Sequence, residues 1–288
     1  MQCSFARDSS LSGMLFDFLE TVFPGLSRAA RNAARLGASW EAVSTPFIGF
    51  LEGRPVAHVG VLELPLIVLG RPVNVASIHA VATHPDHRRR GWYRGVMEEA
   101  LRYCSGRWAT ALLTTEHPEY FEPFGFRFVR EHLFTVRPRP TRAGTALRLM
   151  NLEDAGDVAL LNRLLETREP VSRVLGVVKE KAVFCFNEGS RPLYYSEDLD
   201  VMVCMEMEGA TLRLFDVVGP GLPSLDVLLA RLPQPVEEVA ASFAMDRFAA
   251  EALAQPYILD HGGPSHLMVR GPLAAEGKAF TLPRSART

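Results

Sequence analysis

The sequence has few cysteines and no long apolar run. Its four cysteines (Cys3, Cys104, Cys185 and Cys204) lie far apart, with no C-x-x-C pair and no histidine at zinc-ligand spacing beside them. We therefore expect neither a disulfide framework nor a metal site. Nowhere do 18 apolar residues follow one another, and the N-terminus lacks a basic segment followed by an apolar run of signal-peptide length. These absences predict a cytoplasmic protein without membrane contact.

The sequence also lacks a large net charge. It has 31 Lys and Arg against 33 Asp and Glu, a formal charge of −2, so no field of the whole molecule draws it to nucleic acid or anionic lipid. Any phosphate recognition must be local. Apolar residues make up 48% and charged residues 22% of the 288 residues, which is typical of a globular protein. The length corresponds to about two ordinary domains.

Hydrophobic periodicity in the first half predicts the element order ααβββαβαβ. Two helices open the chain, with a break at Pro24-Gly25, and three antiparallel strands follow. The next helix carries an apolar stripe on one side, which predicts that it packs against a core. The predicted elements are two helices within 9–40, strands 45–51, 56–69 and 73–83, a helix at 91–104, a strand at 108–115, a short helix at 118–124 and a strand at 126–136.

A linker is predicted at 138–145, where Pro138 and Pro140 stiffen the chain and remove backbone donors. A second unit follows at 146–288. Its element order resembles that of the first half, which indicates tandem copies of one fold. Its predicted elements are a strand at 147–150, a helix at 154–168, strands at 192–195, 200–207 and 211–218, a helix at 224–232, a strand at 236–243, a helical stretch at 248–254 and a strand at 266–269.

The most informative stretch is residues 77–97, SIHAVATHPDHRRRGWYRGVM. A buried strand runs into a basic loop that opens a helix, with Arg88, Arg89 and Arg90 at the helix N-terminus. Free N–H groups of a first helical turn and the positive end of the helix dipole form an anion site. Gly91 lets a phosphate approach the backbone. We expect the loop to bind a pyrophosphate; the alternatives are a solvated basic turn and a nucleic-acid patch.

This stretch resembles the acyl-CoA-binding motif R/Q-x-x-G-x-G/A of the GCN5-related N-acetyltransferases, the GNAT superfamily. Arg88 and Gly91 match the motif, whereas Tyr93 replaces its small last residue. The T-x-P before the loop and the triple arginine resemble the Eis-like branch, in which two acetyltransferase folds lie in tandem. Residues 120–126, YFEPFGF, resemble the family's short helix and G-[FY] turn. The resemblance covers residues 1–137 well and the rest by architecture, with no room for the sterol-carrier-like third domain of Eis-like proteins.

The resemblance implies an α/β (α+β) protein of tandem GNAT-like folds, each a mixed, largely antiparallel sheet flanked by helices. Residues 1–137 would be the acetyl-CoA-binding domain and 146–288 a degenerate second copy. In this family two parallel strands splay apart and the pantetheine arm bonds in the gap. Acetyl-CoA is thus implied as co-substrate, without a metal. The implied CoA contacts are Val81, Ala82, Thr83, Arg88, Arg89, Arg90, Gly91, Trp92, Tyr93 and Arg94.

Acetyl transfer to an amine needs a base for the amine proton and a proton for the leaving thiolate. His79 lies on the strand beside the implied acetyl site and suits a general base, or is simply hydrogen-bonded within the sheet. Glu116 follows the next strand and is either catalytic or a helix cap. Related enzymes place a tyrosine where this chain has Phe121. The adjacent Tyr120 is therefore the candidate acid, with a water or no acid as alternatives.

We expect an N-acetyltransferase that moves the acetyl group to a primary amine by direct ternary-complex transfer. A non-catalytic acyl-CoA sensor is the alternative that Phe121 suggests. The acceptor is a small-molecule or peptide amine, and no nucleic acid or membrane is expected as partner. The second unit lacks a loop rich in arginine. It is expected to line the acceptor crevice or to pack on another subunit of a homo-oligomer. Its acidic residues Glu197, Asp198, Asp200, Glu206 and Glu208 either attract a cationic amine or form a solvated face.

Overall fold

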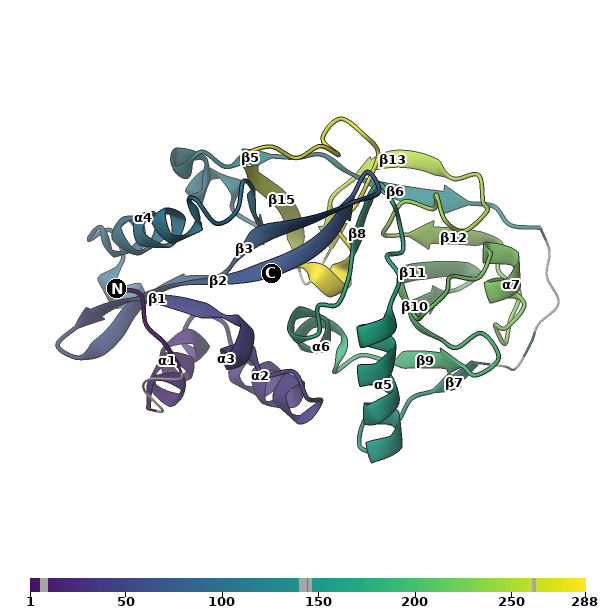
Figure 1. Ribbon diagram of the computed structural model, residues 1–288, viewed down its shortest axis with the longest axis horizontal. Helices are drawn as coiled ribbons and strands as arrows, with labels where there is room; N and C mark the ends of the chain where they lie inside the picture. Colours follow the sequence, from purple (N-terminus) through teal and green to yellow (C-terminus); the bar gives the residue numbers. More distant parts are fainter. Residues whose placement is uncertain (6–9, 140–143, 145–146, 261–262) are drawn as a thin grey trace.

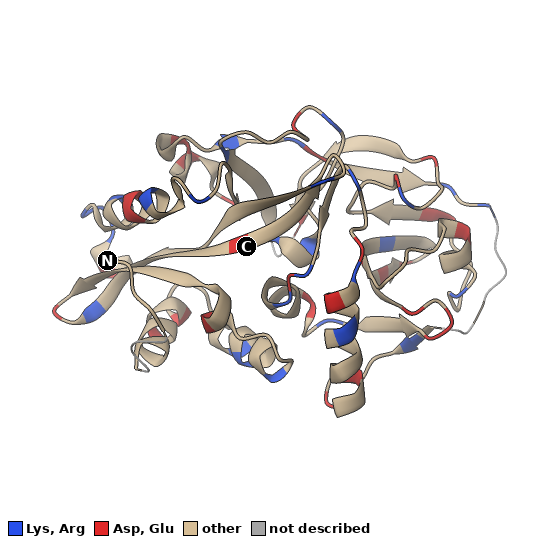
Figure 2. Ribbon diagram, in the orientation of Figure 1, with Lys and Arg blue, Asp and Glu red and all other residues tan. Residues whose placement is uncertain are grey.

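The computed structural model describes residues 1–5, 10–139, 144, 147–260 and 263–288. The chain forms two mixed sheets flanked by helices (Figure 1), which confirms the predicted fold class. Within the described part of the chain, no helix is both long and apolar enough to cross a membrane. Acidic and basic residues are interspersed over both halves (Figure 2), in keeping with the small net charge.

The first sheet has the strand order β1-β2-β3-β4-β15-β14, with β8 paired to β2 and β5 paired to β15. Among the described strands of this sheet, only the pairing of β3 with β4 is parallel, and α4 is the crossover between them. Helices α1 (Leu11–Glu20), α2 (Leu26–Arg35) and α3 (Trp40–Val43) precede the sheet, and α4 spans Trp92–Cys104. The strands are β1 (Thr45–Leu51), β2 (Arg54–Val68), β3 (Arg71–Thr83), β4 (Ala111–Thr115), β5 (Arg127–Phe128), β8 (Leu175–Val177), β14 (Leu259–Asp260) and β15 (Pro264–Arg270).

The second sheet repeats this plan in the order β13-β6-β12-β11-β10-β9-β7. Here β11 and β12 are its parallel pair, and the short helix α7 (Leu225–Leu229) connects them. Two further helices, α5 (Ala155–Thr167) and α6 (Ala182–Glu188), belong to this half. The strands are β6 (Glu131–Val136), β7 (Leu147–Leu149), β9 (Leu193–Ser196), β10 (Val201–Glu208), β11 (Thr211–Val218), β12 (Glu238–Ala241) and β13 (Leu253–Tyr257).

The two halves exchange a strand. β6, expected in the first sheet, pairs with β12 and β13 of the second, while β15 from the end of the chain pairs with β4 of the first. The predicted strand 126–136 is accordingly two strands, since the chain leaves β5 at Phe128 and crosses to the other sheet. An alternating pattern predicts a strand but not its partner. The domain bounds at 137 and 146 stay a prediction, and the sheets do not follow them.

Other local predictions were wrong or incomplete. The helical stretch expected at 248–254 is a turn followed by β13, whose residues 253–257 pair with β6. The short helix expected at 118–124 is two 3-10 turns, Pro118–Tyr120 and Glu122–Phe124. Neither β8 nor α6 was predicted from the sequence. Most of the linker predicted at 138–145 lies outside the described residues.

The last residues of the chain lie between the two sheets. Arg284 forms an ion pair with Glu188 of α6 at 2.8 Å, and Arg287 forms one with Glu131 of β6 at 2.6 Å. All four side chains are at most 6% exposed, so neither pair is screened by water. These pairs fix the segment that brings Thr288 to the first sheet, where Figure 1 marks the end of the chain.

Candidate functional site

The arginine loop, residues 84–91, connects β3 to α4. After the 3-10 turn Pro85–His87, residue Arg89 has φ +63° and Gly91 has φ +83°. Among the described residues, no hydrogen bond uses the N–H groups of residues 89–94 as donors, and the first helical bond runs from Gly95 N–H to the Gly91 carbonyl. Consecutive free N–H groups beside a left-handed residue form a concave anion-binding surface. The backbone is therefore arranged as a pyrophosphate site requires.

The arginine side chains leave this surface accessible. Arg88, Arg89 and Arg90 are exposed, and within the described chain none of the three forms an ion pair with a carboxylate. Arg88 donates from Nε to the Thr83 carbonyl at 3.4 Å, a long hydrogen bond at the end of β3. Three uncompensated guanidinium groups around free amides attract an anion.

Tyr93, the departure from the family motif, points away from the loop. Its hydroxyl donates to the Tyr120 carbonyl at 2.8 Å, and its ring packs edge-on against Phe121 and Phe124. Burial raises the pKa of this phenol. The bulky residue thus ties the first turn of α4 to the segment 118–124.

Open space flanks α4 on two sides. A hollow of about 510 Å³ borders the arginine loop and β1, and is lined by Arg90, Gly91 and Trp92 among others. A second hollow of about 400 Å³ lies toward the segment 118–124 and is lined by Arg94, Arg270 and others. An elongated ligand on the loop therefore has room to extend along either flank of the helix.

The parallel strands β3 and β4 diverge toward this loop. They pair only at Ala76 with Ala111 and at Ser77 with Leu112. Beyond Ser77, β3 continues for six residues to Thr83, paired with β2. The implied pantetheine contacts Val81, Ala82 and Thr83 all lie on this part of β3, which leaves a wedge between β3 and β4.

Thr288 occupies the narrow end of this wedge. Its carbonyl accepts hydrogen bonds from Thr114 N–H at 3.2 Å and from the Thr114 hydroxyl at 2.7 Å. Its hydroxyl lies 2.6 Å from the Ser77 hydroxyl and donates to the Ile78 carbonyl at 3.2 Å. Sequence reasoning missed this residue, because nothing in a local pattern places a residue 210 positions away between two strands.

His79 lies on the face of β3 that turns away from α4, and it is buried. It is 3% exposed, its Nε2 lies 3.0 Å from the Ser44 hydroxyl, and its ring contacts Trp40 edge-on. Burial, and next the charge of His58, hold the pKa of His79 well below its ordinary value. The ring is thus neutral and enclosed, which supports the reading as a hydrogen-bonded sheet residue; a catalytic role stays a prediction.

Glu116, by contrast, is exposed at the carboxyl end of β4. Its carboxylate lies against Gly263 before β15, where an added Cβ would come within 2.4 Å of Oε1. It makes no hydrogen bond to the N–H groups of the following turn among the described residues, so the structure does not support its reading as a cap. Glu116 is the accessible carboxylate among the predicted catalytic residues.

The predicted acid, Tyr120, has an exposed side chain. Tyr120 is 55% exposed and its ring stacks on His117 at 4.9 Å. Phe121, at the position where relatives carry a phenol, is 6% exposed and packs among Tyr93 and Phe126. The tyrosine-to-phenylalanine change thus falls in the core of the first domain, and Tyr120 faces solvent.

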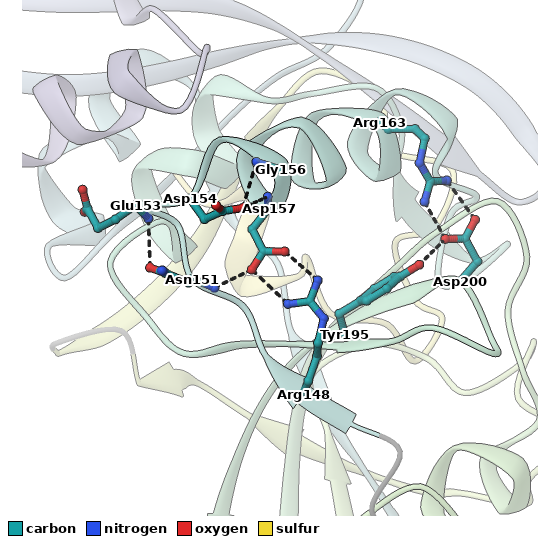
Figure 3. A network of polar contacts seen from close by, with 9 residues as sticks. All are labelled: Arg148, Asn151, Glu153, Asp154, Gly156, Asp157, Arg163, Tyr195 and Asp200. Atoms are coloured by element: carbon teal, nitrogen blue, oxygen red, sulfur yellow. Dashed lines mark hydrogen bonds and ion pairs between the residues drawn. The ribbon is translucent and has the colours of Figure 1, made fainter.

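Four of the five acidic residues that could attract a cationic amine form ion pairs with arginines. Asp200 forms a bidentate ion pair with Arg163 and accepts a hydrogen bond from Tyr195. A second bidentate pair joins Arg148 to Asp157 nearby (Figure 3). Further ion pairs join Asp198 to Arg231, Glu206 to Arg284 and Glu208 to Arg213. Because arginines neutralise these four carboxylates, they do not form a site for a cationic amine. No cluster of three or more metal-ligating side chains occurs in the described chain.

A family model described as an acetyltransferase (GNAT) domain matches residues 9–129. Residues 9–129 are a GNAT acetyltransferase domain. The match contains the divergent strands, the arginine loop and α4. It classes this part of the chain as an acyltransferase, with acetyl transfer as its general chemistry. No curated protein sequence matches the chain.

Two solved structures extend the likeness beyond the GNAT domain. One is a conserved protein from Enterococcus faecalis V583 described as a probable N-acyltransferase, with a TM-score of 0.60 and 15% identity over 96% of this chain and 72% of that one. The other is Eis1 from Mycobacterium abscessus, with a TM-score of 0.53 and 13% identity over 91% of this chain and 71% of that one. At these identities the likeness concerns the fold, and the fold is that of Eis-like proteins.

Proposed function

We propose that the chain is an N-acetyltransferase that moves the acetyl group of acetyl-CoA to a primary amine in a direct ternary complex. The observation that carries the proposal is the wedge between β3 and β4 leading to the arginine loop. The pairing of the strands ends at Ser77 and Leu112, and six backbone N–H groups and three unpaired arginines follow at the far end. An extended arm with a diphosphate at one end fits this arrangement.

In this proposal residues 88–94 hold the pyrophosphate, and the backbone of residues 81–83 bonds the pantetheine arm. The neutral amine attacks the thioester carbonyl carbon; a C–N bond forms, the C–S bond breaks and CoA leaves as a thiolate. Glu116 takes the proton that the amine loses. The thiolate needs no dedicated acid, because thiol pKa values lie near 8.5, so Tyr120 contributes little to the rate.

A second candidate is a non-catalytic acyl-CoA sensor. One observation favours it: the position of the expected phenol is held by Phe121 within the core. Thiol release from acetyl-CoA, measured over a panel of primary amines, separates the two, with CoA binding followed by calorimetry on the same sample. Amine-dependent thiol release supports the transferase. Tight CoA binding with no turnover on any amine supports the sensor, and absence of CoA binding refutes both.

A further inference from the structure

β3 contains a bulge at the point where the wedge opens. His58 of β2 is opposite Ala82, and Gly60 is opposite His79. One residue of β2, Val59, therefore faces two residues of β3, Ala80 and Val81. Ala80 has φ +47°, a left-handed conformation that is sterically unfavourable for a residue with a Cβ. A bulge bends its strand and increases the local twist.

The bulge changes which side chains face α4. Ile78 and Val81 pack into the core beneath α4, while Ala80 and Ala82 pack against α1. Without the extra residue, strict alternation would place Ala80 and Ala82 on the α4 side and Val81 on the other. The bulge therefore sets the orientation of all backbone groups that the proposed function assigns to the pantetheine arm.

His58 holds the bulged residue. Its Nδ1 lies 2.7 Å from the Ala80 carbonyl oxygen, and the side chain is 2% exposed. A carbonyl only accepts, so the ring carries its proton on Nδ1 and donates it. Its Nε2 has no partner among the described residues. The single bond of this buried ring is thus the bond to the bulge. Gly60 completes the arrangement, because a Cβ there would come within 2.0 Å of the His79 ring.

We propose that His58 is a positioning residue for acyl-CoA: by bonding the Ala80 carbonyl it holds the left-handed bulge that turns residues 81–83 toward the wedge. The inference rests on the proposed function, since it assumes that these residues bond the pantetheine arm. His58 itself does not touch the ligand. Its role is therefore tested through the affinity for CoA, and through whether a substitution at residue 80 that eases the left-handed backbone restores that affinity.

The test is CoA binding by calorimetry to wild type, His58→Leu, Ala80→Gly and the double variant, with folding of each checked by thermal unfolding. His58→Leu removes the donor and keeps the bulk, and is expected to bind CoA roughly tenfold more weakly. Glycine adopts positive φ without a steric penalty. Ala80→Gly in the His58→Leu background is therefore expected to restore most of the affinity.

Wild-type affinity in His58→Leu, or an equally weak double variant, overturns the proposal. Should His58→Leu not fold, His58→Asn and His58→Gln replace it: Asn carries an amide N–H near the place of Nδ1, and Gln carries it one atom further out. Retained affinity in Asn with reduced affinity in Gln supports the proposal, and the reverse order or equal affinities contradict it. If wild type does not bind CoA at all, it is the proposed function that fails.

Discussion

The guanidinium of Arg287 donates to both carboxylate oxygens of Glu131 at 2.6 Å, and neither side chain is more than 3% exposed. Glu131 is the first residue of β6, the strand from the first half of the chain that pairs in the second sheet. Arg287 directly precedes Thr288, which lies between β3 and β4. The pair therefore connects the strand exchange to the candidate site.

Breaking this pair is expected to destabilise the protein strongly. Glu131→Ala leaves a buried guanidinium without its partner, which typically costs about 3–5 kcal/mol. Urea unfolding of Glu131→Ala, Arg287→Ala and the double variant measures this. The double variant should lose less than the sum of the single losses, because it leaves no unpaired charge. Additive losses would show that the pair contributes nothing as a pair.

The left-handed glycine of the arginine loop offers a matched comparison with a helical one. Gly91 has φ +83° and Gly95 lies within α4, and a Cβ on either would meet no atom within 4 Å. Gly91→Ala is therefore expected to cost about 1 kcal/mol through the backbone alone and to weaken CoA binding. Gly95→Ala should gain roughly 0.5–1 kcal/mol from helix propensity. Changes of the same sign in the free energy of unfolding, relative to wild type, for both variants would contradict the assigned conformations.

Replacing the accessible carboxylate should affect the chemistry more than binding. Glu116→Gln is expected to lower kcat roughly 10²–10⁴-fold, the usual contribution of a general base, with CoA affinity unchanged. Glu119→Gln is the control, because Glu119 is a nearby exposed carboxylate that contacts His117 instead. Steady-state rates of both variants decide the matter. Equal rates for Glu116→Gln and wild type would remove Glu116 from the mechanism.

How far the sequence predicted the molecule depended on the range of the interactions. The arginine loop and α4 were predicted from residues 77–104, because an anion site at a helix start is built from neighbours in the chain. The β6–β15 exchange, Thr288 in the wedge and the Arg287–Glu131 pair join residues far apart in sequence, for which no local pattern exists. The burial of His79 could not be predicted from the sequence either, since it depends on contacts with Trp40 and Ser44 from other elements.

Acid is expected to destabilise the fold through His58. Burial lowers the pKa of His58 to about 4, below the value of about 6.5 for an unfolded chain. The unfolded state thus binds the proton first, so stability is complete above about pH 6.5 and falls as the pH drops toward 4. From His58 alone the loss between pH 7 and pH 5 is about 2 kcal/mol. Urea unfolding at both pH values should show a smaller loss in His58→Asn, and an equal loss would contradict the assignment.

Binding of a diphosphate by the arginine loop is tested most directly by calorimetric titration with CoA and with pantetheine, which lacks both the diphosphate and the 3′-phosphoadenosine attached to it. Wild type should bind CoA at least roughly tenfold more tightly than pantetheine. The combined Arg88→Ala, Arg89→Ala and Arg90→Ala variant should lose most of that difference, whereas Arg31→Ala with Arg71→Ala, exposed arginines of other elements, should keep it. Equal affinity of wild type for the two compounds, or an undiminished preference in the triple variant, would contradict the account.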